Sequence, residues 1–286
     1  MIKNLFVIVN CLTMLFVVGC FGKGRLKPIA IEAQNDIYIF VQLTDNHLGA
    51  DPKCSKITEN LIKEINKYKD QRPIDFIAIT GDLFDGRQYN SALDDYKYIQ
   101  KKSDFPIHAL AGNHDYNLQR AGIADKAVGG RNAELWKENF GAFNYYVDIR
   151  NVRFIFMSTE CLISGIDTEK NDFYKWLEAR LDEASGCSKD IIIFTHMPIV
   201  KNFYKGRLSS AYSEHEYQKL EQLLQKYKVN AIVAGHFHFE ELDMLGNIPV
   251  YVCPASVNRL CDSGKFRVYE YNTKNKFLKY KTFEIQ

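Results

Sequence analysis

Residues 105–115 read FPIHALAGNHD, and this stretch decides which fold we predict. Its first part, FPIHAL, is a short apolar run of the kind that forms a buried strand. The run ends at Gly112, and Asn113, His114 and Asp115 follow directly. In α/β proteins the carboxyl ends of strands hold ligands and catalytic groups. The stretch therefore indicates either an ordinary polar turn or one corner of a site, and the rest of the chain has to distinguish the two.

The same pattern of an apolar run followed by polar residues occurs at four further places. These runs end in TDNHLG (44–49), TGDLFDG (80–86), THMP (195–198) and GHFH (235–238). Five of the seven histidines lie in the five exits: His47, His114, His196, His236 and His238. Parallel strands in one sheet bring their carboxyl ends to a single edge. We therefore predict that Asp, His and Asn side chains from these exits share one crevice.

From residue 36 onward, strand-like and helix-like patterns alternate, which is typical of an α/β domain. Ser213 and Glu216 have the spacing of a capping box, which predicts that a helix begins there. We see no repeat, low-complexity tract or interior linker, so we predict one domain over 36–286. Strands are predicted at 36–44, 75–80, 106–112, 152–158, 191–198 and 229–238, helices at 56–68, 89–101 and 172–184, and only strands from 248 onward.

The residue types in the exits indicate a metal centre. Imidazole suits zinc, iron and manganese, whereas carboxylate and amide oxygens suit harder cations. The exits hold too many such groups for one ion. Their number fits two ions, an arrangement that in proteins acts on phosphoesters.

In chain order the exits read D-x-H, G-D-x-x-D, G-N-H-D, H and G-H-x-H over residues 45–238. This ordered series resembles the calcineurin-like metallophosphoesterase family. The stretch ENFGAFNYYVD, followed by VRFIFMST, is similar to the middle of extracytoplasmic members of that family. The resemblance implies an α/β fold, a four-layer α-β-β-α sandwich with two mixed β-sheets. It also implies a metal site at the C-terminal strand ends.

The resemblance implies two divalent metal ions, manganese (Mn), iron (Fe) or zinc (Zn), with manganese favoured. The ligands implied are Asp45, His47 and His238 for the first ion, Asn113, His196 and His236 for the second, and Asp82 as a bridge. Asp85 stands where purple acid phosphatases carry a metal-binding Tyr, which argues against a tyrosinate–iron(III) centre. Because His236 and His238 are two residues apart, an extended segment would point both toward the site, one for each ion.

The implied reaction is hydrolysis of a phosphate mono- or diester by a metal-bridged hydroxide. His114 would be the general acid that protonates the leaving oxygen, because imidazole exchanges a proton near neutral pH. The alternative for His114 is a hydrogen bond behind a ligand. Asp115 is expected to serve catalysis by orienting His114 or the Asn113 loop, and Asp85 to support a ligand. Two other functions stay open: a metal-dependent nuclease of the DNA-repair type and a non-catalytic metal-binding scaffold.

The N-terminus predicts export. Lys3 precedes an apolar run from residue 5 to 18 that fits a secretory signal and is short for a membrane span. Residues 17–20, VVGC, resemble the bacterial lipobox. We predict a signal peptide over 1–19, a lipidated Cys20 with a flexible tether to residue 35, and a membrane-anchored lipoprotein on the periplasmic or cell-surface side. An ordinary cleaved signal and a retained anchor helix are the alternatives.

The charge balance bears on partners. The formal net charge is +2, and such a near-neutral chain gives no reason to expect nucleic-acid binding, which counts against the nuclease. The presence of every implied ligand counts against the scaffold. We expect a monomer that acts on a small-molecule phosphoester. The odd number of cysteines argues against a disulfide framework, although a bridge between Cys253 and Cys261 stays open.

Overall fold

The structure is a computed structural model of the chain. The described residues belong to one compact unit that runs from Asn35 to Gln286. They are 36–70, 73–85, 89–115, 118–119, 123–124, 126–164, 167–203, 208–209, 211–260 and 262–285. The predictions for the signal peptide, Cys20 and the tether, and for Cys261, lie outside these residues. Within them, no helix has the length and apolar character needed to cross a membrane.

The first sheet carries the strands that lead into three of the five exits. Strands β1 (Ile37–Leu43), β2 (Phe76–Thr80) and β3 (Ile107–Leu110) lie parallel and side by side. On the other side of β1, β15 (Ser263–Asn272) runs antiparallel to it. Two more strands pair with β15: β14 (Val257–Asn258) and β16 (Phe277–Ile285).

The second sheet carries the other two exits and has the order β12-β13-β11-β8-β7-β6. Its four central strands are parallel: β7 (Val152–Phe156), β8 (Asp190–Phe194), β11 (Ala231–Ala234) and β13 (Ile248–Val252). Its edges are the antiparallel strands β6 (Tyr145–Ile149) and β12 (Glu241–Leu245). Two further pairs of short antiparallel strands belong to neither large sheet. They are β4 (Leu118–Gln119) with β5 (Ile123–Ala124) and β9 (Asn202–Phe203) with β10 (Leu208–Ser209).

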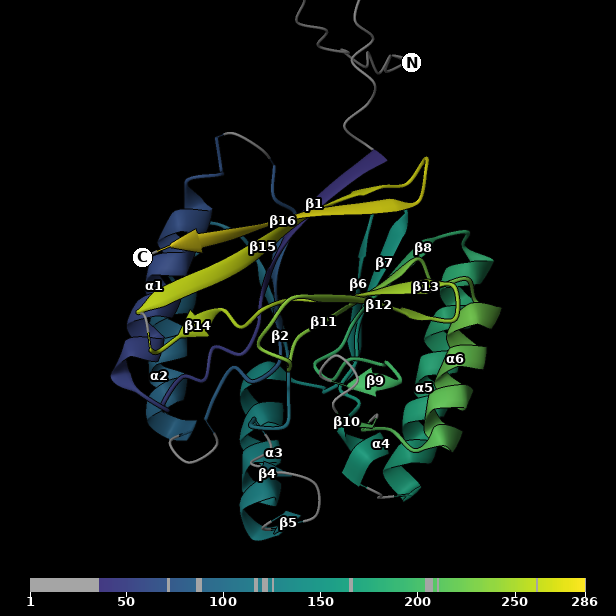
Figure 1. Ribbon diagram of the computed structural model, residues 1–286, viewed down its shortest axis with the longest axis horizontal. Coiled ribbons are helices and arrows are strands. Elements are labelled where there is room, and N and C mark those ends of the chain that lie inside the picture. The colour runs from purple at the N-terminus through teal and green to yellow at the C-terminus, as the bar shows by residue number, and fades with distance from the viewer. Residues whose placement is uncertain are drawn as a thin grey trace, which may run out of the picture. The chain divides into compact units, whose positions relative to one another are not determined.

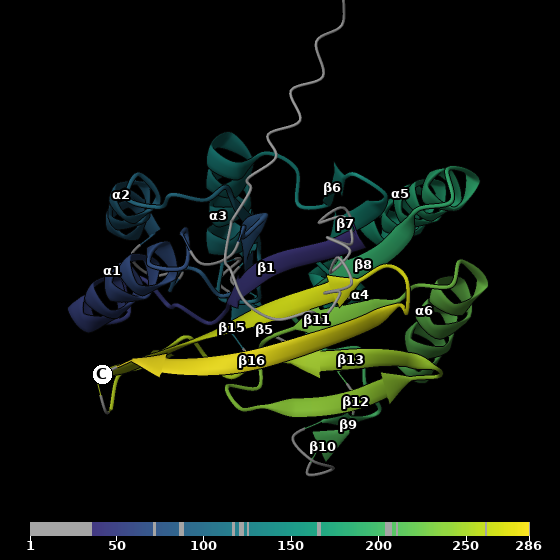
Figure 2. The same ribbon diagram turned by 90° about the horizontal axis from the view of Figure 1, so that it is seen from above.

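Helices cover the outer faces of both sheets, with α1 and α2 on one side and α5 and α6 on the other (Figures 1 and 2). Their starts follow local sequence signals. The Asp51 side chain caps α1 by accepting from Lys53 N, and Ser213 caps α6 by accepting from Glu216 N, as the capping-box spacing predicts. The helices are α1 (Pro52–Asn66), α2 (Tyr89–Gln100), α3 (Lys126–Phe140), α4 (Glu160–Ser164), α5 (Asp167–Gly186) and α6 (Glu214–Lys226).

Three apolar cores separate four layers. Alternate residues of β1 point to opposite faces, so Ile39 and Val41 pack with α1 while Tyr38 and Phe40 face the second sheet. The core between the sheets is largely aromatic, with the Phe40 and Phe194 ring centroids 5.2 Å apart. These cores confirm the predicted four-layer α-β-β-α sandwich with two mixed sheets.

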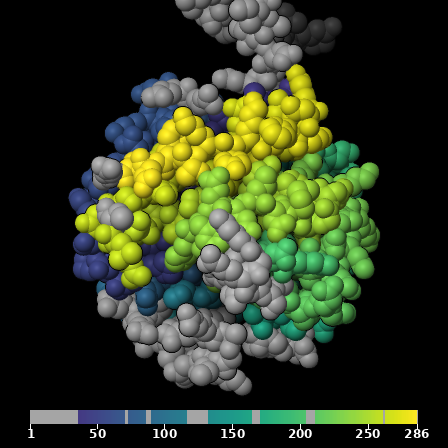
Figure 3. Space-filling view, in the orientation of Figure 1, coloured from purple at the N-terminus to yellow at the C-terminus, as the bar shows by residue number. Residues whose placement is uncertain are grey.

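The two sheets also meet on the surface. In the space-filling view, the C-terminal strands in yellow adjoin the green strands of the second sheet (Figure 3). At this seam the Tyr280 hydroxyl of β16 donates to Glu240 Oε1, 3.0 Å away, in the segment that follows β11.

We assumed, in reasoning from parallel strands, that all five exits leave one sheet, and this assumption is wrong. Three exits come from the first sheet and two from the second, because the chain changes sheets after β3.

Candidate metal centre

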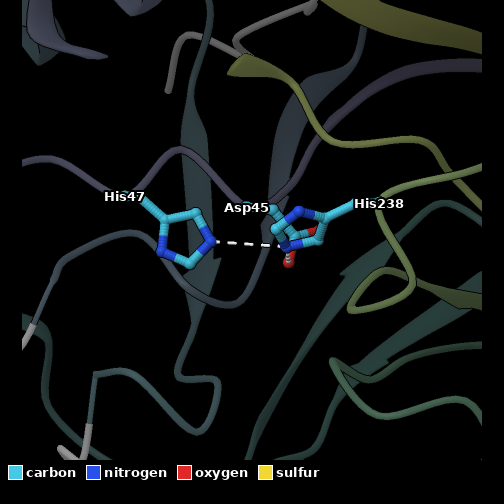
Figure 4. Close-up of side chains that lie close together, drawn as sticks. All are labelled: Asp45, His47 and His238. Atoms are coloured by element: carbon cyan, nitrogen blue, oxygen red, sulfur yellow. Dashed lines mark hydrogen bonds and ion pairs between the residues drawn. The ribbon is translucent and has the colours of Figure 1, made fainter. Parts of the chain in front are cut away.

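The exits of both sheets bring the implied metal ligands together in two adjoining clusters. The first cluster holds Asp45, just beyond β1, with His47 and His238, and Figure 4 shows the three side chains facing one another. Nε2 of His238 lies 3.4 Å from Nε2 of His47 and 3.2 Å from Oδ1 of Asp45. The potential ligand atoms of all three residues lie within 4.8 Å of one another. Both sheets therefore contribute to this cluster.

The second cluster surrounds the ring of His196, which follows β8. Nε2 of His196 lies 3.2 Å from Oδ2 of Asp82, 3.2 Å from Oδ1 of Asn113 and 3.2 Å from Nδ1 of His236. The first sheet supplies Asp82 and Asn113, and the second sheet supplies the two histidines. This cluster, too, is shared between the sheets.

Asp82 stands between the two clusters. Its Oδ2 atom faces His196 Nε2 at 3.2 Å and His47 Nε2 at 3.9 Å, while its Oδ1 accepts the backbone N–H of His114 at 2.8 Å. The side chain is 2% exposed. A carboxylate in this position is close enough to serve both clusters at once.

Most of the clustered residues adopt a backbone conformation that non-glycine residues rarely use. Such left-handed residues are costly and are characteristic of functional sites. Backbone hydrogen bonds hold this conformation where the exits of β1 and β2 run side by side, from Asp45 N to Gly81 O (3.0 Å) and from His47 N to Asp82 O (2.9 Å). The positive φ angles are 53° at Asp45, 48° at His47, 49° at Asp82, 72° at His236 and 62° at His238.

The left-handed conformation corrects one expectation about the GHFH segment. We expected His236 and His238 on an extended segment with both rings on one side. The segment is instead bent, with positive φ at both histidines. His236 N donates to Asp45 Oδ2, 3.1 Å away, which anchors the bend on the first sheet. The two rings still enter different clusters, because the bend separates them.

The side chains fit bound cations. Asp45 Oδ1 is buried and receives no hydrogen bond from the described part of the chain, although it faces His238 Nε2. Ring nitrogens of different histidines face each other at 3.2–3.4 Å, an arrangement that a shared cation stabilises. Nδ1 of His196 lies 2.9 Å from Thr80 O, so Nδ1 carries the hydrogen and Nε2 turns its lone pair toward the cluster. This nitrogen and oxygen donor set suits manganese, iron and zinc.

The electrostatics agree with a cation site. Burial lowers the pKa of His47, and it lowers the pKa of His236 to about 4, so both rings are neutral and can donate a lone pair. Burial alone would raise the pKa of Asp82, but the positive charge of His196 outweighs it and keeps that pKa well below its usual range. Burial opposes the charge of His196, yet Asp82 raises the pKa of this imidazole overall. The carboxylate of Asp82 thus favours a positive charge at this position.

His114 lies at the side of the first cluster and is partly exposed. Its ring stands edge-on to that of His47, with centroids 4.8 Å apart. A ring nitrogen of His114 lies within 4.8 Å of ligand atoms of His47 and Asp82. Its imidazole is therefore beside the clusters while its backbone is fixed on Asp82.

The side chain of Asp115 is bound to the backbone of the loops next to the clusters. Its carboxylate is buried and accepts three backbone N–H groups, from Gly112 at 2.8 Å, Phe84 at 2.8 Å and Leu83 at 3.2 Å. These bonds join the loop of Asn113 to the loop of Asp82. For Asp85, the structure shows a backbone bond from its N–H to Leu48 O, 2.8 Å away, which also ties neighbouring exits together.

Sequence reasoning did not single out two hydroxyl side chains that lie at the centre, Thr44 and Ser256. Thr44 Oγ1 lies 2.8 Å from Asp45 Oδ2 and 3.0 Å from Thr80 O. Ser256 Oγ accepts from Thr44 N at 2.9 Å, and Ser256 N donates to Thr44 O at 2.8 Å. Thr44 could have been noticed because a threonine precedes the polar residues in three of the exits. Ser256 lies outside every motif, so only the fold brings it here.

Gly112 occupies a place where no side chain fits. A Cβ atom there would lie 2.4 Å from Asp82 Oδ1 and 2.6 Å from Asp82 N. We expect Gly112→Ala to displace Asp82, to weaken metal binding and to destabilise the protein by about 1–3 kcal/mol, as overpacking does in cores. Thermal unfolding with and without added metal measures both effects. Gly186→Ala is the control, because a Cβ there meets nothing within 4 Å, and equal behaviour of the two variants would contradict the prediction.

Comparisons with known proteins come from sequence and from structure. A family model described as calcineurin-like phosphoesterase matches residues 38–240. Purple acid phosphatase 23 of Arabidopsis thaliana is 27% identical over 167 residues, which cover 57% of this chain and 35% of that protein. The chain thus spans about a third of the length of this curated relative.

Two solved structures share the fold. A dimetal phosphatase from Danio rerio superposes with a TM-score of 0.59 at 13% identity, covering 81% of this chain and 92% of the other. Purple acid phosphatase PPD1 from yellow lupin, Lupinus luteus, superposes with a TM-score of 0.58 at 18% identity, covering 88% of this chain and 54% of the other. At these identities the likeness establishes a common fold.

Proposed function

The chain belongs to the calcineurin-like phosphoesterase family, and from this premise we propose that it hydrolyses a phosphoester bond at a two-metal centre. The observation that carries the proposal is the position of Asp82. Its Oδ2 atom faces a histidine of each cluster, at 3.2 Å from His196 and 3.9 Å from His47. Two cations about 3.5–4 Å apart repel each other strongly, so a carboxylate between them is the group that such a centre requires.

In this proposal each cluster holds one divalent ion. Asp45, His47 and His238 would bind the first, Asn113, His196 and His236 the second, and Asp82 both. When bound, the ions supply Lewis acidity that lowers the pKa of water and offsets the negative charge of the phosphoryl group. The chain itself holds the ligands rigidly, because the exits are fixed by backbone hydrogen bonds between neighbouring loops.

His114 would complete the reaction by giving a proton to the leaving oxygen. Its backbone N–H is bound to Asp82, so the point from which its side chain leaves the backbone is fixed relative to both clusters. The partly exposed imidazole is accessible to a substrate that rests on the clusters. Asp115 would contribute indirectly, since its three backbone hydrogen bonds fix the loop that carries His114.

The decisive experiment compares two substrates on the purified protein. It is stripped of metal, resupplied with manganese, zinc or iron(II), and assayed with p-nitrophenyl phosphate and bis-p-nitrophenyl phosphate. We expect metal-dependent turnover, and the preferred ester tells whether the protein is a phosphatase or a phosphodiesterase. Absence of turnover on both esters, with two ions bound per chain, would contradict the proposal and favour the scaffold.

A further inference from the structure

The two-metal centre is divided between the two sheets. Asp45, Asp82 and Asn113 follow strands of the first sheet, whereas His196 and His236 follow strands of the second. Each cluster draws its side chains from both sheets. Ligand atoms must lie within a few tenths of an ångström of their preferred distance from a metal ion. The separation between the sheets near these exits therefore has to be fixed closely.

A single buried amide joins the sheets just below the centre. Gln42 lies on the face of β1 that turns toward the second sheet, among the aromatic side chains of the middle core, and it is 0% exposed. Its Nε2 donates to Thr80 Oγ1 at 2.7 Å and to Ala234 O at 2.9 Å. The bond to Ala234 crosses from the first sheet to the second. Both amide hydrogens are thus used inside the protein.

The three strands that Gln42 joins all lead into the metal centre. Gln42 itself lies three residues before Asp45, Thr80 lies two before Asp82, and Ala234 lies two before His236. A shift of this amide would therefore move ligands of both clusters relative to each other. In an apolar core such bonds are strong, because water cannot replace them.

The orientation of the amide is itself fixed. Gln42 Oε1 accepts from the Tyr269 hydroxyl of β15, 2.9 Å away, so the amide cannot turn its oxygen toward Ala234. The same hydroxyl accepts from Arg267 Nη1 at 3.3 Å. Arg267 is 0% exposed, donates to Val252 O at 3.1 Å and pairs with Glu240 at 2.8 Å, two residues beyond His238. The network thus continues to the segment that carries the last ligand.

From these contacts we infer that Gln42 is a positioning residue that sets the separation of the two halves of the metal centre. The inference rests on the proposed two-metal function, because it assigns Gln42 an effect on metal geometry. It concerns metal affinity rather than the chemical step, since Gln42 lies below the ligands and does not meet a substrate.

The test compares Gln42→Met with Tyr271→Phe. Methionine has nearly the same size as glutamine and donates no hydrogen bond. Tyr271 is the matched control, because its hydroxyl also joins the sheets, through Asp190 Oδ2 at 3.0 Å, but at the first residue of β8, far along the strand from the exit. We expect Gln42→Met to weaken the binding of cobalt(II) by about 10- to 100-fold, as loss of partners behind metal ligands does.

The absorption spectrum of bound cobalt(II) should change in Gln42→Met and stay as in the wild type in Tyr271→Phe. Tyr269→Phe is a milder variant in case Gln42→Met does not fold, and it should weaken cobalt(II) binding in the same direction. Wild-type affinity and spectrum in the Gln42 or Tyr269 variants, with only a lowered unfolding temperature, would overturn the inference. A wild-type protein that binds two ions but hydrolyses nothing would instead contradict the proposed function, and the comparison of affinities would still decide the role of Gln42.

Discussion

Replacing Asp82 with asparagine is expected to abolish tight binding of two ions and to lower metal-dependent turnover by about two to three orders of magnitude, as loss of a group that stabilises charge does. Asparagine has almost the shape of aspartate and can still accept from His114 N, so the loop keeps its hydrogen bond. What disappears is the negative charge that faces both clusters at 3.2 and 3.9 Å. Two nearby divalent ions then repel each other with less compensation, and one of them leaves.

The measurement is metal content after dialysis, followed by activity at saturating manganese. Asp75→Asn is the control, because Asp75 precedes the same strand at its opposite end and accepts Ile39 N at 2.8 Å. That variant should lose some stability and keep both ions. If Asp82→Asn also retained two tightly bound ions, the carboxylate would not be the bridge, and the assignment of two clusters to two ions would fail with it.

The sequence predicts the central strands well because each is buried on both faces. Strands such as β2 and β8 are buried at every position, so they appear in the sequence as unbroken apolar runs. The edge strands β6 and β12 alternate between partly exposed and exposed residues, apart from the buried Leu245 at the end of β12, and the sequence analysis did not predict them. Helix α3 was also missed, since among its described side chains Trp136 is the only apolar one that is fully buried.

The order of strands within the sheets could not be read from local patterns. Strands β3 and β7 are both apolar runs that lead to polar residues, yet one belongs to the first sheet and the other to the second. Which sheet a strand joins depends on pairing with segments that lie far apart in the sequence, as β3 pairs with β2 and β7 with β8. The prediction of a single edge failed for this reason, although the side chains it grouped together do meet.

The candidate site divides in the same way. Histidine, aspartate and asparagine after apolar runs are conspicuous, so the seven residues that meet in the two clusters could be named as candidate ligands from the sequence. The left-handed backbone of residues such as Asp45 left no comparable signal, because aspartate and histidine adopt many conformations. Gln42 did leave a signal in the sequence, because it is the only amide side chain in the apolar strand IYIFVQL, and an amide both donates and accepts hydrogen bonds. Its role becomes apparent only in the folded protein, where its Nε2 donates to Ala234 O of the second sheet.

Substituting His114 is expected to spare metal binding and to slow the hydrolysis of some esters far more than others. His114→Ala keeps the backbone N–H that binds Asp82, so the clusters should retain both ions. A general acid contributes about 10²–10⁴-fold when the leaving group needs a proton. An alkoxide needs one, whereas p-nitrophenolate is stable without it. The loss should therefore approach this range for an ethyl ester and be several-fold at most for the matching p-nitrophenyl ester.

The ratio of the two losses is the informative quantity, because a structural defect lowers both rates together. His215→Ala is the matched control, since His215 is exposed in the first turn of α6 and should be replaceable without effect on either ester. An equal loss on both esters, with metal content unchanged, would assign His114 to substrate binding or to support of a ligand. A loss of metal would place it in the cluster with His47 and Asp82, whose ligand atoms lie within 4.8 Å of its own. Only a selective loss on the alkyl ester is consistent with proton donation to the leaving group.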